Sequence, residues 1–142
     1  MKNREIKYWI IVASKDHVKT GINEGIAQAC HGKAAPLKRL HKDDFVIYYS
    51  GKLTYGKSDK CQEFTAIGKV KDNDVYQYQI TPDFCPSRRK VNFIESKSIS
   101  ILPLINSLEF IKNKKSWGYP FRYGLLEISR NDFDLISSQM LM

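Results

Sequence analysis

The chain has 142 residues, enough for one domain to bury a core without disulfides or a metal ion. Hydrophobic residues make up 42% and charged residues 27%, as in ordinary globular proteins, and no apolar run approaches the roughly 20 residues that span a bilayer. The formal net charge is +8, which favours polyanionic partners over cationic ones.

The first predicted elements are a strand and a helix. Residues 6–13 form a largely apolar run, rich in β-branched and aromatic side chains, that predicts a strand. The run is too short for a signal-peptide core, so we expect a cytoplasmic protein. Ser14 and Asp16 are both candidate caps of a helix that we expect over about residues 16–29, although Gly21 and Gly25 weaken it. A second, short helical stretch is predicted at 37–40, after a proline.

The middle of the chain alternates strand and turn patterns. Residues 45–50 form a second predicted strand, and the lysine-rich stretch 51–60 is a predicted loop. Residues 64–71 and 75–80 are predicted to form a β-hairpin, because the Asp-Asn-Asp sequence between them favours a turn.

A loop with two prolines, residues 81–87, precedes the next predicted strand at 88–95. Alternation in this strand places Val91 and Phe93 on one side, together with Arg89. Residues 103–108 begin with proline and predict a short helix.

The chain ends in a strand, predicted at 125–128, and a helix capped by Ser129. Phe133, Ile136 and Met140 lie along one face of that helix. Many short strands with only brief helices predict one domain, residues 1–142, in the α+β class but mostly β: a small β-barrel flanked by short helices.

The charge is distributed unevenly. Residues 1–71 hold 14 Lys+Arg and 7 Asp+Glu, a balance of +7, whereas residues 72–142 hold 9 and 8, a balance of +1. An excess in one half favours a basic face that attracts phosphate backbones. The 17 lysines outnumber the 6 arginines, which favours phosphate contact over reading of base edges.

The cysteines and histidines do not predict a metal site. Cys30, Cys61 and Cys85 are an odd number without a CxxC spacing, and the three histidines are scattered. We therefore expect no disulfide framework, no metal and no cofactor.

The segment 113–128 gathers Trp117, Phe121 and Arg122 around two aromatic-glycine steps. A planar guanidinium beside flat rings suits stacking on, and hydrogen bonding to, a nucleobase. The alternative is that both rings belong to the core and the arginine is a solvated charge.

Five segments carry a family resemblance: YWIIVASKDHV at 8–18, HGKAAPLKRL at 31–40, DFVIYYS at 44–50, FTAIGKV at 64–70 and NKKSWGYPFRYGLLEIS at 113–129. In this order, over nearly the whole chain, they resemble the EVE domain, and most closely the stand-alone uncharacterised EVE proteins of bacteria and archaea. The resemblance implies a PUA-like β-barrel with helices packed around it. It also implies a nucleic-acid partner, RNA or DNA, because YTH and SRA relatives read modified bases.

The resemblance also proposes pocket residues. Ser14 matches the small polar residue at the pocket rim of YTH-like domains, with helix capping as its alternative role. Trp117 would supply a stacking wall and Arg122 a hydrogen-bonding or phosphate-binding group. Tyr49 and Ser50 would line the floor, unless they pack within the barrel.

Two further pairs are candidates for phosphate contact. His31 and Lys33 belong to a turn whose backbone and lysine can meet a phosphate. Arg88 and Arg89 begin a predicted strand and are candidates for backbone contact, or else are solvated strand-end charges.

An enzyme is the alternative to a binding domain. Some ASCH relatives hydrolyse acylated nucleosides with a lysine and an acid, and Lys15, Lys33 and Glu127 are the residues to nominate. Nothing in the spacing puts a nucleophile beside a base, and no GxSxG, P-loop or HExxH string is present. We therefore expect a binder rather than an amidohydrolase; a purely structural partner-binding module is the third class.

Overall fold

The computed structural model describes residues 5–142, and most of its regular structure is β-sheet. The strands are β1 (Tyr8–Val12), β2 (Ile26–Ala27), β3 (Phe45–Lys52), β4 (Lys60–Val70), β5 (Tyr76–Gln77), β6 (Ser87–Ile94), β7 (Ile99–Ser100) and β8 (Leu125–Ile128). The α-helices are α1 (Lys15–Glu24), α2 (Ala34–Lys38) and α3 (Arg130–Met140). Short 3₁₀ helices are η1 (Cys30–Gly32), η2 (Leu102–Leu104) and η3 (Tyr119–Tyr123).

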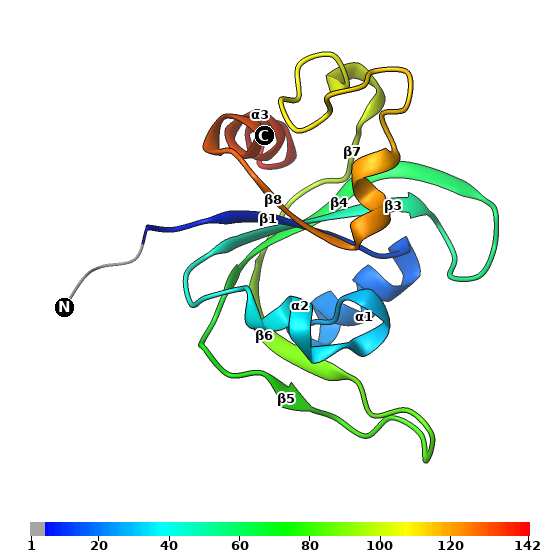
Figure 1. The fold of residues 1–142 in the computed structure, drawn as a ribbon, viewed down its shortest axis with the longest axis vertical. Helices are drawn as coiled ribbons and strands as arrows, with labels where there is room; N and C mark the ends of the chain where they lie inside the picture. Colours follow the sequence, from blue (N-terminus) through cyan, green and yellow to red (C-terminus); the bar gives the residue numbers. More distant parts are fainter. Residues whose placement is uncertain (1–4) are drawn as a thin grey trace.

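One curled sheet organises the fold. Its strand order is β2-β6-β4-β3-β1-β8, with β5 added to β6 and β7 to β4. β1 and β3 run parallel, whereas β1 and β8 are antiparallel. Figure 1 shows α1 and α2 on one side of β1 and β3, and α3 on the other. The prediction of a mostly β, barrel-like α+β fold is confirmed. Within residues 5–142, no helix is long and apolar enough to cross a membrane.

β1 runs between two apolar clusters, which explains why its sequence is continuously apolar. Successive side chains of a strand point to opposite faces of the sheet. Ile10 packs into a cluster with α3 residues, whereas Trp9 and Ile11 pack into a second cluster beside α1 and α2. The Trp9 indole N–H donates to the Asp44 carboxylate over 2.9 Å, so this tryptophan is a core residue with its polar atom satisfied.

The first predicted helix is shorter in the structure than in the sequence analysis. α1 ends at Glu24, and Gly25 adopts a left-handed conformation with φ of 68°. The chain then enters β2, where Ile26 and Ala27 pair with the middle of β6. The prediction of a helix to residue 29 was wrong. Gly25 ends the helix, and the next two residues form a strand that pairs with β6.

The predicted hairpin of residues 64–71 and 75–80 was also wrong. β4 pairs with β3 and β6, while β5 pairs with β6 through Tyr76 and Gln77. The Asp-Asn-Asp sequence does separate the two strands, but the second strand, β5, pairs with β6 and not with β4.

The C-terminal prediction is confirmed. The Ser129 hydroxyl accepts from the Asp132 N–H over 3.2 Å at the start of α3. Phe133, Ile136 and Met140 are buried along one face. The helix predicted after Pro103 is the single 3₁₀ turn η2, followed by irregular turns.

Candidate functional site

A cleft of about 900 Å³ opens where the ends of several elements meet. Its lining comes from the β1–α1 junction, α1, the segment from β2 through η1, the end of η3, the β3–β4 loop and the turn between β5 and β6. Tyr48, Cys30 and Gly124 lie in its wall. The volume is in the range of small-molecule sites, and most of the lining is apolar.

Asp16 fastens one rim of the cleft. Its carboxylate accepts from the Ser14 hydroxyl, from the His17 N–H over 2.8 Å and from the Tyr55 N–H over 3.2 Å. The hydrogen bond from Ser14, helped by those backbone N–H groups, lowers the pKa of Asp16 below its usual value. The carboxylate thereby joins the start of α1 to the β3–β4 loop, and the Asp16 N–H adds a bond to the Leu53 carbonyl over 3.1 Å.

The same rim carries a pair of stacked rings. His17 and Tyr55 have ring centroids 4.7 Å apart and planes inclined by 20°. Both line the cleft, and both are exposed. Neither residue is predicted from the sequence, although an aromatic side chain within a lysine-rich loop is a signal, because a polar loop does not need a ring for its own packing.

Arg88 is held in the cleft wall by three partners. Its Nε donates to the Gln28 side-chain oxygen over 2.8 Å, and its Nη1 lies 3.3 Å from the Glu24 carboxylate. The guanidinium also lies over the Tyr78 ring, 4.3 Å from the centroid. These contacts fix both the position and the plane of the positive charge.

η3 is anchored to the core by Phe121. The Phe121 ring stacks on Tyr49 with centroids 3.9 Å apart and meets Phe110 edge-on at 5.7 Å. Burial raises the pKa of Tyr49, which therefore stays neutral in this stack.

The end of η3 is fixed by Gly124, which has φ of 76°. A Cβ at this position would lie 2.6 Å from the Cys30 sulfur, so the close approach requires glycine. The Gly124 carbonyl accepts from the Val12 N–H over 2.9 Å at the end of β1. Arg122 and Tyr123, between the two anchors, line the cleft.

Of the sequence-predicted site residues, the structure brings Ser14, His31, Arg88 and Arg122 together at the cleft. They come from the start of α1, η1, β6 and η3. Ser14 is also the N-cap residue of α1, although its hydroxyl binds the Asp16 carboxylate rather than a backbone N–H.

The other predicted residues, all within the described range, lie elsewhere. Tyr49 and Phe121 pack against each other in the core, and the buried Ser50 hydroxyl is 2.7 Å from that of Thr65. Trp117 is half-buried and packs against the cluster that contains Phe121. Lys33 is exposed at the start of α2. Their proposed contacts with a ligand stay predictions.

Arg89 lies in the interior, where only 1% of the residue is exposed. Its Nη1 donates to the carbonyls of Leu37 and Leu40 over 2.8 and 2.6 Å, and its Nη2 donates to the Asp72 carbonyl. The side chain thus ties the end of α2 and the turn after β4 to β6. Burial lowers its pKa, while nearby carboxylates, including that of Asp44, oppose the shift.

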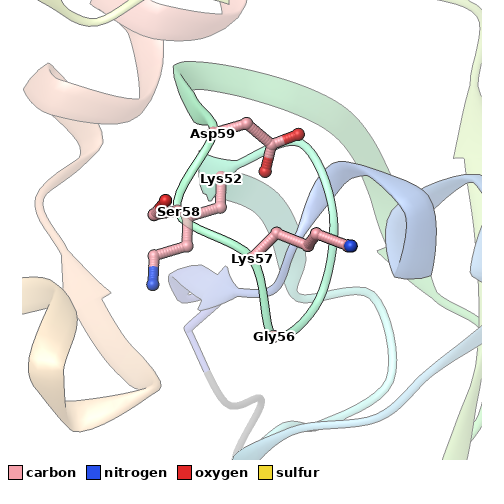
Figure 2. A pocket seen from close by; sticks show the side chains of 5 residues that line it. All are labelled: Lys52, Gly56, Lys57, Ser58 and Asp59. Atoms are coloured by element: carbon pink, nitrogen blue, oxygen red, sulfur yellow. The ribbon is translucent and has the colours of Figure 1, made fainter.

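A second hollow, of about 500 Å³, belongs to the β3–β4 loop alone. Figure 2 shows Lys52 and Lys57 extending in different directions from this loop, with Ser58 and Asp59 beside them. Because its cationic groups diverge, the hollow does not form a site that converges on one ligand.

Two of the residues nominated for hydrolysis, Lys15 and Glu127, have other charged partners in the structure. Lys15 pairs with Glu63 at 3.3 Å, and Glu127 lies 3.7 Å from the Lys7 ammonium group. Among residues 5–142, no group of three or more His, Cys, Asp or Glu side chains is arranged to hold a metal ion.

Comparison with known proteins identifies the family. The EVE domain model matches residues 7–139. The chain belongs to the EVE domain family. A UPF0310 protein in the gntR 5′ region of Bacillus licheniformis is 51% identical over 128 residues, which cover 90% of this chain and 87% of that protein. A UPF0310 protein of Mycobacterium avium is 42% identical and covers 93% and 96%.

Solved structures show the same fold at low sequence identity. A hypothetical protein from Leishmania major superposes with a TM-score of 0.62 at 11% identity, over 94% of each chain. Rpa0253 from Rhodopseudomonas palustris gives 0.57 at 14% identity, over 95% of this chain and 93% of that one. The EVE domain is a PUA-like family, which suggests nucleic-acid binding in general terms.

Proposed function

We propose that this EVE domain binds nucleic acid and holds one base, plain or modified, in the cleft. The observation that carries the proposal is that exposed rings gather around a cleft with planar polar groups in its wall. Tyr55, Phe84 and Tyr123 are exposed and line it, although apolar rings exposed to water are costly unless a ligand covers them.

The chemistry of the wall suits a flat heterocycle. A base needs faces to stack on and hydrogen-bonding groups at its edge. The His17–Tyr55 pair offers an aromatic face, and the Gln28 amide and the Arg88 guanidinium offer fixed polar atoms. Glu24, which pairs with Arg88, leaves the wall without a large excess of positive charge. The cleft therefore favours a base over a phosphate.

The phosphates of the bound strand contact the surface beside the cleft. Lys52, Lys57 and Lys60 are exposed on or next to the β3–β4 loop that carries Tyr55. Together with the +7 balance of residues 1–71, they favour a polyanionic strand running past the cleft.

The test is a fluorescence anisotropy titration with labelled single-stranded RNA and DNA over a range of salt concentrations. Affinity should fall steeply as salt rises, because bound strands release counterions. Arg122→Ala should weaken binding several-fold, whereas the matched control Arg130→Ala, an exposed arginine on α3, should not. Absence of binding at low salt, or binding that ignores salt, would contradict the proposal.

A further inference from the structure

η3 presents two rings to solvent that the core does not need. Tyr119 is 54% exposed and Tyr123 is 63% exposed, while the ring of Phe121 is stacked in the core. In a 3₁₀ helix of about three residues per turn, Tyr119 and Arg122 share a face and Tyr123 lies beside them.

The two tyrosines hold each other in place. Their ring centroids are 6.0 Å apart and their planes are inclined by 80°, so they form a corner. The Tyr123 hydroxyl donates to the Tyr119 hydroxyl over 3.5 Å, a long hydrogen bond that raises the pKa of Tyr123. The Arg122 guanidinium lies over the Tyr119 ring, 5.3 Å from its centroid. Tyr119 is thus occupied by its neighbours, and Tyr123 is the more exposed ring of the pair.

The backbone beneath this corner is fixed before any ligand arrives. Phe121 is stacked in the core on one side, and on the other Gly124 fits against Cys30 and bonds to β1. A ring on such a support loses little freedom on binding, which favours affinity. Exposure of a well-supported ring therefore points to a ligand-binding surface rather than to a loose loop.

The size of the corner argues for a nucleotide rather than a protein. One buried aromatic side chain covers about 150–250 Å², whereas a stable protein interface needs about 800 Å² from each partner. The corner offers two partly exposed rings, and Arg122 and Tyr123 also line the cleft. The surface is therefore continuous with the place proposed for the base, and it is as large as one further base.

We infer that Tyr123 is a second stacking site, which takes the nucleotide next to the base in the cleft, with Tyr119 as its positioning residue. The ligand is then a single strand of at least two nucleotides, and a free nucleoside or mononucleotide fills only part of the site. This inference rests on the proposed function and adds the requirement for a neighbouring nucleotide.

The experiment compares two probes, adenosine 5′-monophosphate and single-stranded octaadenylate, by NMR chemical-shift titration at low salt. Stacking a base on a ring contributes about 1–3 kcal/mol, or roughly five- to 150-fold in affinity. Tyr123→Ala should weaken octaadenylate binding by that factor and should weaken mononucleotide binding by a clearly smaller factor, because Tyr123 is only one of the residues that line the cleft. Tyr123→Phe should keep the affinity, and Tyr119→Ala should give a smaller loss than Tyr123→Ala.

The matched control is Leu102→Ala, which removes a side chain of similar exposure, 55%, from η2. It should change neither affinity. The inference fails, while the proposed function stands, if Tyr123→Ala binds octaadenylate as tightly as the wild type or weakens both probes equally. It also fails if the wild type binds both probes with the same affinity. If the wild type binds neither probe at low salt, the proposed function fails with it.

Discussion

Neighbouring arginines of β6 have different surroundings, because one belongs to the framework of the fold and the other to the wall of the candidate cleft. Arg88 and Arg89 are 5% and 1% exposed, so burial does not distinguish them. Arg89 donates to main-chain carbonyls of two other segments, whereas Arg88 contacts the side chains of Gln28, Glu24 and Tyr78 at the cleft. Main-chain partners make one side chain part of the framework. Side-chain partners in the cleft wall place the other beside the space where a ligand is proposed to bind.

η3 repeats the contrast over two residues. Phe121 stacks on Tyr49 in the core, while Arg122 is exposed at the cleft. In both segments, a residue buried in the core places its neighbour at the site. Substitution of matched pairs can therefore separate loss of the framework from loss of binding.

The largest effect is expected for Arg89→Met. The substitution removes the guanidinium that donates to the carbonyls of Leu37, Leu40 and Asp72, although the Leu37 carbonyl still accepts from the Leu40 N–H over 3.2 Å. Leaving one buried polar group unpaired typically costs about 1–3 kcal/mol, and because this substitution affects more than one carbonyl, a loss of about 3 kcal/mol is expected. Urea denaturation should show a loss of that order in the free energy of unfolding. Arg89→Lys retains the charge but not the planar fork, and it should also destabilise the protein. Wild-type stability of both variants would show that Arg89 is not part of the framework.

Trp117→Ala should have the next largest effect, on stability. A fully buried tryptophan costs about 3–5 kcal/mol on truncation, and Trp117 is half-buried against the core cluster, so about 2 kcal/mol is expected. Thermal unfolding and oligonucleotide titration on the same sample separate the two roles. Unchanged affinity with a lowered Tm supports a packing role. Lost affinity with an unchanged Tm would support the role that the sequence predicts for Trp117, which is to stack on the ligand.

Arg88→Met makes the same change as Arg89→Met at the neighbouring position. It should reduce stability less and should also weaken binding. Gln28 and Glu24 lie at the cleft, where water can replace the lost guanidinium, so the stability loss should be about 1 kcal/mol. Affinity for single-stranded nucleic acid should fall about tenfold, as expected for about 1.4 kcal/mol. Anisotropy titration measures this loss. A stability loss equal to that of Arg89→Met would remove the contrast between the two arginines.

The sequence predicted the strands and the final helix where the apolar pattern was clear, as in β1, which is apolar on both faces, and in α3, which has one apolar face. It failed where a single residue changed the path, as at Gly25, or where pairing is decided by distant strands, as for β5. Alternation placed Arg89 on the side of Val91 and Phe93, which the structure confirms, because a strand has a fixed period of two.

The candidate site was harder to predict, because residue type does not say which side of an element faces a cleft. Tyr49 and Ser50 end the strand that the sequence predicts, as pocket residues often do, yet β3 continues to Lys52 and both side chains are buried in packed surroundings. His17 and Tyr55 are 38 positions apart, and they meet where Asp16 binds the backbone of the distant loop. No local pattern contains that contact.

The smallest effect is expected from protonation of Asp16, which fastens the Tyr55 side of the cleft. The folded state holds its pKa below the ordinary value of 3.8, chiefly through the Ser14 hydroxyl. The carboxylate therefore contributes stability that is present above about pH 4 and is lost as pH falls through the folded pKa. Urea denaturation between about pH 6 and pH 3 should show a smaller drop in unfolding free energy for Asp16→Asn than for the wild type.

The matched control for that experiment is Asp134→Asn on α3, where the carboxylate is exposed and pairs with Arg130 at 3.7 Å. It should follow the wild-type pH profile closely, because an exposed ion pair contributes little. NMR of the Tyr55 ring should report the same event at the cleft, since protonated Asp16 holds the Tyr55 N–H less strongly and the stack on His17 loosens. If the profiles of the wild type and Asp16→Asn have the same shape, the Asp16 carboxylate does not hold this rim, and the His17–Tyr55 contact must depend on the packing of the loop alone.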